Sequence, residues 1–134
     1  MTLDELYIYA EDKEIEVDDF PMRELVSASF PENWIAMDSR KMKTRAEEKV
    51  ILAHEVGHCE TGSFYNIYSP YDSKERHERK ANVWSYRKLV PHEDLIAAVQ
   101  KGITEIWELA EYFDVPCDYM QKAAEYWRQV ELTG

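Results

Sequence analysis

The sequence has few of the features that mark secreted or membrane proteins. Only two of its 134 residues are cysteine, Cys59 and Cys117, which is too few for the disulfide framework of a small secreted domain. The chain is long enough to bury a hydrophobic core without such cross-links. No apolar run approaches the roughly 20 residues of a membrane span, and the acidic first segment lacks the apolar region of a signal peptide. These absences predict a cytoplasmic protein that makes no membrane contact.

Basic residues are also scarce. The chain has 16 lysines and arginines against 27 aspartates and glutamates, a formal net charge of −11. Such a surface repels phosphate backbones, so nucleic acid is not expected as the main ligand, and a basic protein segment fits better. The apolar fraction of 45% and the aromatic fraction of 13% are typical of a globular protein rather than a disordered one.

The most informative stretch that is present is AHEVGHCETG, residues 53–62. His54 and His58 have the spacing i, i+4, so on a helix both imidazoles lie on one face and can bind one ion. Glu55 is placed to hold a metal-bound water and to accept its proton. The alternative is a chance motif on a surface helix. The apolar residues before the motif and Gly57 within it argue against that alternative.

A catalytic zinc needs a third protein ligand and one open position. Glu78 is our choice, because it shares a helix face with Asn82, whose side chain could orient a ligand imidazole. Ala81 would let this helix pack closely on the first. Spacing alone leaves Glu78 equally compatible with a solvated, charge-rich face. The candidates for the third ligand are Glu75, His77, Glu78, His92 and Glu93.

These residue types predict hydrolysis of a peptide bond by activated water, without an acyl-enzyme. Zinc would lower the pKa of bound water toward ~7 and polarise the substrate carbonyl. Glu55 would act as general base and then deliver the proton to the leaving amine. The sequence does not choose an oxyanion donor among the nearby candidates Tyr65, Tyr68, Tyr71 and His77.

The pattern of apolar residues predicts an α+β fold in one domain, residues 1–134. A first helix, 2–10, and a small antiparallel sheet precede a zincin-like H-E-x-x-H helix at 43–61, which begins at Thr44 and ends at Gly62. Gly57 suggests that another backbone, such as the sheet, approaches this helix closely. The predicted strands are 14–18, 24–29 and 34–38, and the expected core residues of the last strand are Trp34, Ile35 and Met37.

The C-terminal half is predicted to be mainly helical, after an aromatic loop at 63–73. The predicted helices are 74–90, 92–101, 104–113 and 118–130. The domain thus divides into 1–42 (helix and sheet), 43–91 (metal-site helix pair) and 92–134 (helical cap). Residues 103–134 have helix-turn-helix rhythm but hold seven acids and only two bases, so they are not expected to bind DNA. We expect them instead to form either a helical cap that packs on the rest of the domain or a surface that docks a partner. The residues that a cap would pack inward are Ile106, Leu109, Phe113, Met120 and Trp127.

The paired motifs His54-Glu55-x-x-His58 and Glu78-x-x-Ala81-Asn82 resemble those of the ImmA/IrrE family of metallopeptidases. The likeness extends to the surrounding A-H-E-V-G-H and to Leu89-Val90-Pro91 at the end of the second helix. It implies that His54, His58 and Glu78 bind zinc and that Glu55 is catalytic.

The resemblance to the prophage and mobile-element branch also implies a partner, a helix-turn-helix repressor that such peptidases cleave or inactivate. A second hypothesis is a metal-containing binding module, an anti-repressor that sequesters its partner with little proteolysis. A third is a structural zinc protein. Glu55 argues against the third, because a closed structural site has no use for a general base. The oligomeric state is not predicted.

Overall fold

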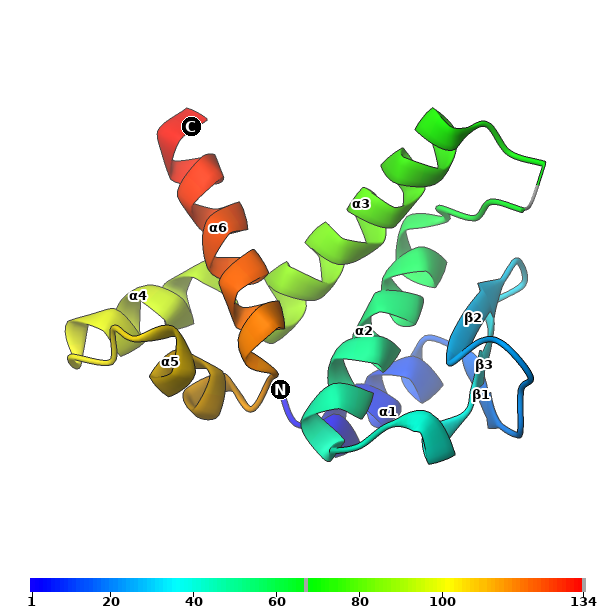
Figure 1. Cartoon of the computed structure of the whole chain (residues 1–134), viewed down its shortest axis with the longest axis horizontal. Helices are drawn as coiled ribbons and strands as arrows, with labels where there is room; N and C mark the ends of the chain where they lie inside the picture. Colours follow the sequence, from blue (N-terminus) through cyan, green and yellow to red (C-terminus); the bar gives the residue numbers. More distant parts are fainter. Residues whose placement is uncertain (67, 134) are drawn as a thin grey trace.

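The computed structural model describes residues 1–66 and 68–133 (Figure 1). Ile67, in the predicted aromatic loop, and Gly134, at the end of the predicted domain, lie outside the described residues. A small sheet and one helix come first, and the second half of the chain is helical, which confirms the α+β class. The helices are α1 (Leu3–Asp12), α2 (Arg45–Thr61), α3 (Tyr71–Leu89), α4 (His92–Gln100), α5 (Ile106–Phe113) and α6 (Cys117–Thr133), and the strands are β1 (Glu16–Asp19), β2 (Ser27–Phe30) and β3 (Trp34–Met37).

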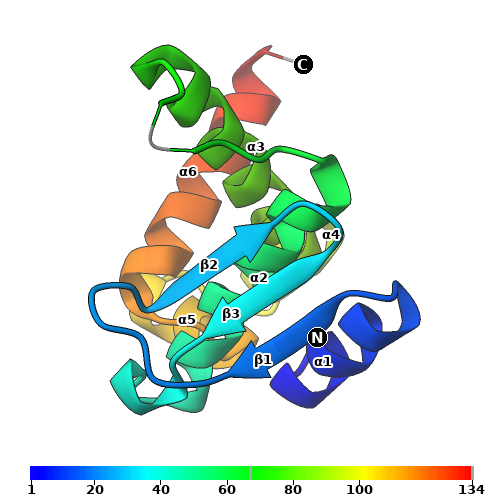
Figure 2. The ribbon, with the colours of Figure 1, turned by 90° about the vertical axis from the view of Figure 1, so that its right-hand side faces the viewer.

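The sheet is mixed, so the prediction of a wholly antiparallel sheet was wrong. β2 and β3 form an antiparallel hairpin, but β1 pairs with β3 in parallel, with Val17 opposite Ile35. The order is β1-β3-β2 because the segment between β1 and β2 crosses the end of the sheet and places β2 at the far edge (Figure 2). Strand alternation alone does not record which neighbour a strand will have.

Alternate residues of β3 point to opposite faces of the sheet. Ile35 and Met37 are fully buried against the helices, as predicted. Trp34 is only half-buried, so its assignment to the core was wrong. Its ring stacks on Phe30 of the neighbouring strand, with 4.7 Å between ring centroids.

Helix α2 begins and ends as the sequence predicts. The Thr44 side chain accepts a hydrogen bond from the Glu47 amide at its first turn. Gly62 closes the helix in the left-handed conformation, with φ of 64°. Helix α2 packs against β2 and β3 on one side and against α3 on the other.

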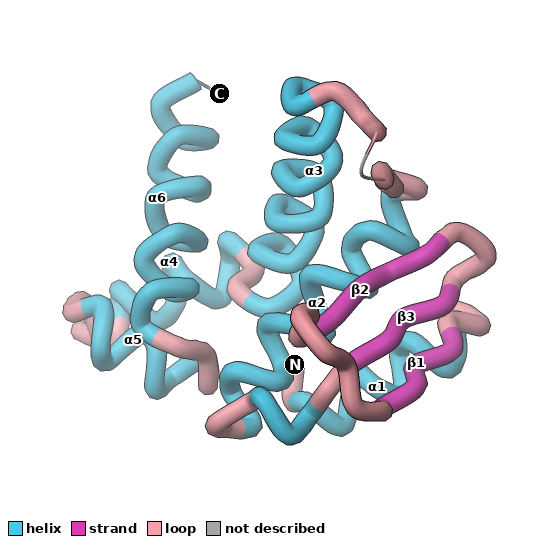
Figure 3. Tube along the Cα trace, turned by 45° about the vertical axis from the view of Figure 1, so that its right-hand side comes forward, coloured by secondary structure: helices cyan, strands magenta, loops and turns pink. Residues whose placement is uncertain are grey.

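Helix α3 begins at Tyr71, three residues earlier than predicted, immediately after Pro70. It runs antiparallel to α2 and then meets the C-terminal helices at its far end. There the Tyr119 hydroxyl donates to Ser85 Oγ (2.9 Å) and Trp127 Nε1 donates to the Val90 carbonyl (2.8 Å). Beyond these contacts α3 and α6 diverge (Figure 1), and α3 is the one nearer the sheet (Figure 3).

Helices α4 to α6 lie close to their predicted ranges and pack on the rest of the chain. Leu109, Met120 and Trp127 are buried, and Ile106 and Phe113 are partly buried against the core, as predicted. Within the described part of the chain, none of the helices has the length and apolar character needed to cross a bilayer.

Candidate metal centre

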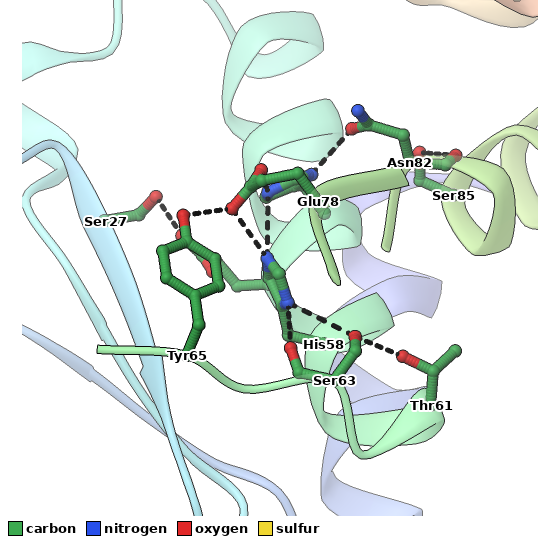
Figure 4. A network of polar contacts seen from close by, with 10 residues as sticks. Ser27, His58, Thr61, Ser63, Tyr65, Glu78, Asn82 and Ser85 are labelled. Carbon is green, nitrogen blue, oxygen red and sulfur yellow. Dashed lines mark hydrogen bonds and ion pairs between the residues drawn. The ribbon is translucent and has the colours of Figure 1, made fainter. Parts of the chain in front are cut away.

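Helices α2 and α3 bring three potential metal ligands together. His54 and His58 lie one turn apart on α2, with 3.2 Å between their Nε2 atoms. The Glu78 carboxylate reaches across from α3, with Oε2 2.8 Å from His54 Nε2 and Oε1 3.2 Å from His58 Nε2 (Figure 4). Two ligands each about 2.1 Å from a tetrahedral ion lie about 3.4 Å apart, and the two imidazole nitrogens, at 3.2 Å, are close to that spacing.

The far nitrogens of both imidazoles are held by oxygen acceptors. His58 Nδ1 donates to the Ser63 carbonyl (2.5 Å), and His54 Nδ1 donates to Asn82 Oδ1 (2.8 Å). With the ring protons on Nδ1, both Nε2 atoms of the neutral rings carry lone pairs. Two nitrogen lone pairs and a carboxylate then face one another, and a cation fits that set of ligands.

The close approach of α3 to α2 depends on Gly57. A Cβ at this position would lie 2.7 Å from the Ala81 carbonyl oxygen and 3.1 Å from the Ala81 Cα. The backbone that approaches Gly57 therefore belongs to α3, and the suggestion that it was the sheet was wrong. Because Ala81 is one turn from Glu78, this contact sets the depth at which the Glu78 carboxylate meets the histidines.

The charges of the site are strongly coupled. An imidazole that is protonated at Nε2 as well donates to the Glu78 carboxylate, and such hydrogen bonds from His54 and His58 hold the pKa of Glu78 well below its usual range, despite partial burial. Burial opposes a charge on His54, but the hydrogen bond to Glu78 and the nearby Glu55 outweigh it and raise the pKa of His54. A proton and a metal ion therefore compete for the same pair of groups.

Glu55 lies beside the cluster and is almost fully buried, at 6% exposure. Ser27 Oγ, on the edge strand β2, donates to Glu55 Oε2 at 2.5 Å. Ser27 was not predicted, because nothing in a strand pattern marks a contact with a helix residue 28 positions away. Ser63 was not predicted either, because it acts through its main-chain carbonyl and its side chain gives no signal in the sequence.

The other candidates for a third ligand lie outside the cluster. His92 pairs with Glu131 at 2.7 Å and stacks on Trp127, at the far end of α3. Glu75 hydrogen-bonds to Tyr71, and Glu93 is exposed at the start of α4. His77 is half-buried, and its buried Nδ1 has no hydrogen-bond partner among the described residues.

Of the four candidates for an oxyanion donor, Tyr65 contacts the cluster. Its hydroxyl donates to Glu78 Oε1 at 2.5 Å. Partial burial and that hydrogen bond raise the pKa of Tyr65 to about 12, so it remains a donor at neutral pH. Tyr68 and Tyr71 are exposed at 88% and 72%.

A cleft of about 780 Å³ opens over this cluster. Its walls are the edge strand β2 on one side and the segment after α2 with the start of α3 on the other. Both apolar and polar side chains line the cleft. Its lining residues are Leu25, Ser27, Ala28, Ser29, Phe30, Pro31, Glu55, His58, Phe64, Tyr65, Asn66, Lys74 and Glu78.

Two comparisons with known proteins bear on this geometry. A search of curated proteins gives no significant match to the chain. The model of peptidase family M78, described as the IrrE N-terminal-like domain, matches residues 13–125. This match spans the sheet, the cluster and most of the C-terminal helices, and shows that the chain belongs to the ImmA/IrrE family of metallopeptidases.

Proposed function

We propose that this protein is a zinc-dependent endopeptidase of the cytoplasm. The observation that carries the proposal is the convergence of His54, His58 and Glu78 as three acceptors, with the Glu55 carboxylate beside them. Two histidines and one glutamate with an open position are the ligand set of a catalytic rather than a structural zinc. Family membership supports the peptidase class.

In this proposal each residue around the cluster has one task. His54, His58 and Glu78 hold the zinc, which supplies Lewis acidity and a more acidic water when bound. Asn82 and the Ser63 carbonyl fix the orientation of the imidazoles through their Nδ1 protons.

Glu55 takes the proton of the attacking water and passes it to the leaving amine. Ser27 holds Glu55 Oε2 through its hydroxyl, which fixes the carboxylate on the cleft side of α2. The Tyr65 hydroxyl is the donor nearest the cluster, and we assign to it the stabilisation of the oxyanion.

The edge strand β2 supports an extended protein substrate. Its outer edge pairs with no other strand of the described residues, since the sheet order is β1-β3-β2, and its residues 27–30 line the cleft beside Glu55. Such an edge can hydrogen-bond to the main chain of an incoming segment. We propose that the segment belongs to a helix-turn-helix repressor of a prophage or mobile element, with residues 92–134 as a helical cap of one domain.

Cleavage of the helix-turn-helix protein encoded beside this chain tests the proposal. Wild type with zinc should cut the repressor, whereas chelator or Glu55→Gln should leave it intact. Glu60→Gln is the matched control, since it makes the same chemical change at an exposed position of α2 and should retain cleavage. A repressor that stays intact but bound under every condition would replace the peptidase with an anti-repressor that sequesters its partner.

A further inference from the structure

Helix α3 carries a concentration of positive charge. In a chain of net charge −11 with 16 basic residues, this one helix holds six of them. Four of the six line a single groove. The basic residues of α3 are Lys74, Arg76, Arg79, Lys80, Arg87 and Lys88.

The groove has an apolar floor and a basic rim. It measures about 460 Å³, and its floor is formed by Val83 and Trp84. Thr61 of α2 also lines it, and no carboxylate is among the described lining residues. The rim consists of Arg76, Arg79, Lys80 and Arg87.

Helical spacing separates this groove from the metal cluster. Arg76, Lys80 and Arg87 follow one another at i, i+4 and i+11, which places them on one stripe of the helix. Glu78 and Asn82 lie on the opposite side of α3, facing α2. A ligand in the groove would therefore leave the cluster and its cleft accessible.

The rim charges have little internal compensation. Arg87 donates to the Tyr126 hydroxyl at 2.8 Å and lies over the Trp127 ring, neither of which is an anion. Arg76, Arg79 and Lys80 are exposed, and none of them forms an ion pair within the described part of the chain. Four cations around an apolar floor favour a ligand that combines several carboxylates with an apolar side chain.

The charge on the rest of the molecule limits the size of that ligand. A long polyanion such as a nucleic acid would extend beyond the groove and meet the strongly acidic remainder of the surface. A short acidic segment interacts with the rim alone, because charges more than about 10 Å away are largely screened at physiological salt. Val83 and Trp84 also offer nothing to a sugar-phosphate backbone but can bury an apolar side chain.

We propose that this groove of α3 is a docking site for a short acidic segment of a partner protein, which carries an apolar residue among its carboxylates. Binding there requires neither the metal nor Glu55, so the inference goes beyond the proposed peptidase activity and can fail separately from it. If the partner is also the substrate, the groove fixes its position while the cleft receives the cleaved segment.

The test uses a short synthetic peptide in which four glutamates surround one leucine, titrated into the isotope-labelled full chain. We expect amide shift changes confined to residues 76–87 and the neighbouring Thr61, and affinity that weakens as salt rises from about 50 to 200 mM. Arg76→Glu with Lys80→Glu should weaken binding at least about tenfold. The matched control, Arg23→Glu with Lys43→Glu, changes the net charge equally at two exposed sites outside α3 and its groove and should bind normally.

Four results would overturn the proposal. The first is equal binding of the peptide with glutamine in place of glutamate. The second is equal loss in both double variants, because net charge alone would then explain the binding. The third is a duplex oligonucleotide that binds the same face as tightly as the peptide, which would make the site a nucleic-acid contact. The fourth is self-association of the chain that the peptide disrupts, which would make it an interface between copies.

Discussion

Replacing Gly57 with alanine tests whether the contact between α2 and α3 sets the geometry of the metal centre. The added Cβ would lie 2.7 Å from the Ala81 carbonyl oxygen, whereas ordinary contact begins at 3.4 Å. The α3 backbone must therefore withdraw by about 0.7 Å, because a main-chain atom cannot rotate away. Glu78 lies one turn from Ala81 and would move with it.

Two effects on stability oppose each other in this variant. Alanine is favoured over glycine inside a helix by about 1 kcal/mol, while overpacking a close helix contact costs about 1–3 kcal/mol. The free energy of unfolding should fall by no more than about 2 kcal/mol, which lowers Tm by less than about 10 °C. Zinc affinity should fall more than stability does, since metal–ligand distances vary by only about 0.2 Å. We expect a loss of affinity of at least about tenfold.

A competition titration with a chromogenic chelator measures the zinc affinity, and thermal unfolding of the chelated protein measures stability. Ala81→Gly in the Gly57→Ala background is the control. It should not restore affinity, because the contacted atoms are the main chain of residue 81 rather than its methyl group. Unchanged zinc affinity together with a raised Tm would refute the reasoning, since helix propensity alone would then describe the substitution.

Three further predictions concern the same centre and the C-terminal helices. Asn82→Ala should lower zinc affinity about 10–100-fold, whereas Asn82→Asp keeps an acceptor for His54 Nδ1 and should retain affinity in the chelator titration. The raised pKa of His54 keeps its proton bound above the usual imidazole range, while Glu78, with its lowered pKa, stays ionised. Zinc affinity should therefore fall as pH drops from about 8 to 6, by up to about tenfold per unit for one displaced proton, and a flat profile would contradict this. Trp127→Ala should lower the free energy of unfolding in urea by about 3–5 kcal/mol. Trp127→Phe loses the hydrogen bond to Val90 and should cost about 1 kcal/mol, so equal losses in both variants would argue against packing as the cause.

Local patterns in the sequence were enough to locate the two helices of the metal centre. The Thr44 cap and the Gly62 terminus bound α2 as predicted, because capping depends on residues within one turn. The face shared by Glu78 and Asn82 follows from a spacing of four. The structure places both side chains next to the histidines.

Features that depend on pairing between distant segments were predicted less well. The parallel direction of β1 was missed, because alternation gives the faces of a strand but not its neighbour. Trp34 was assigned to the core although it stacks on Phe30 at a half-buried position, since an aromatic residue in a strand fits either face.

By itself the sequence determined the two-histidine spacing, the glutamate between them and the acidic balance of the chain, from which nucleic acid is not expected as the main ligand. Only the tertiary structure decided that α3 contacts Gly57, that Ser27 holds Glu55 and that four basic side chains share one groove. The physical reason is the distance along the chain over which each effect acts. Helical periodicity fixes which residues share a face, whereas the partner of each face is selected by the packing of the whole core.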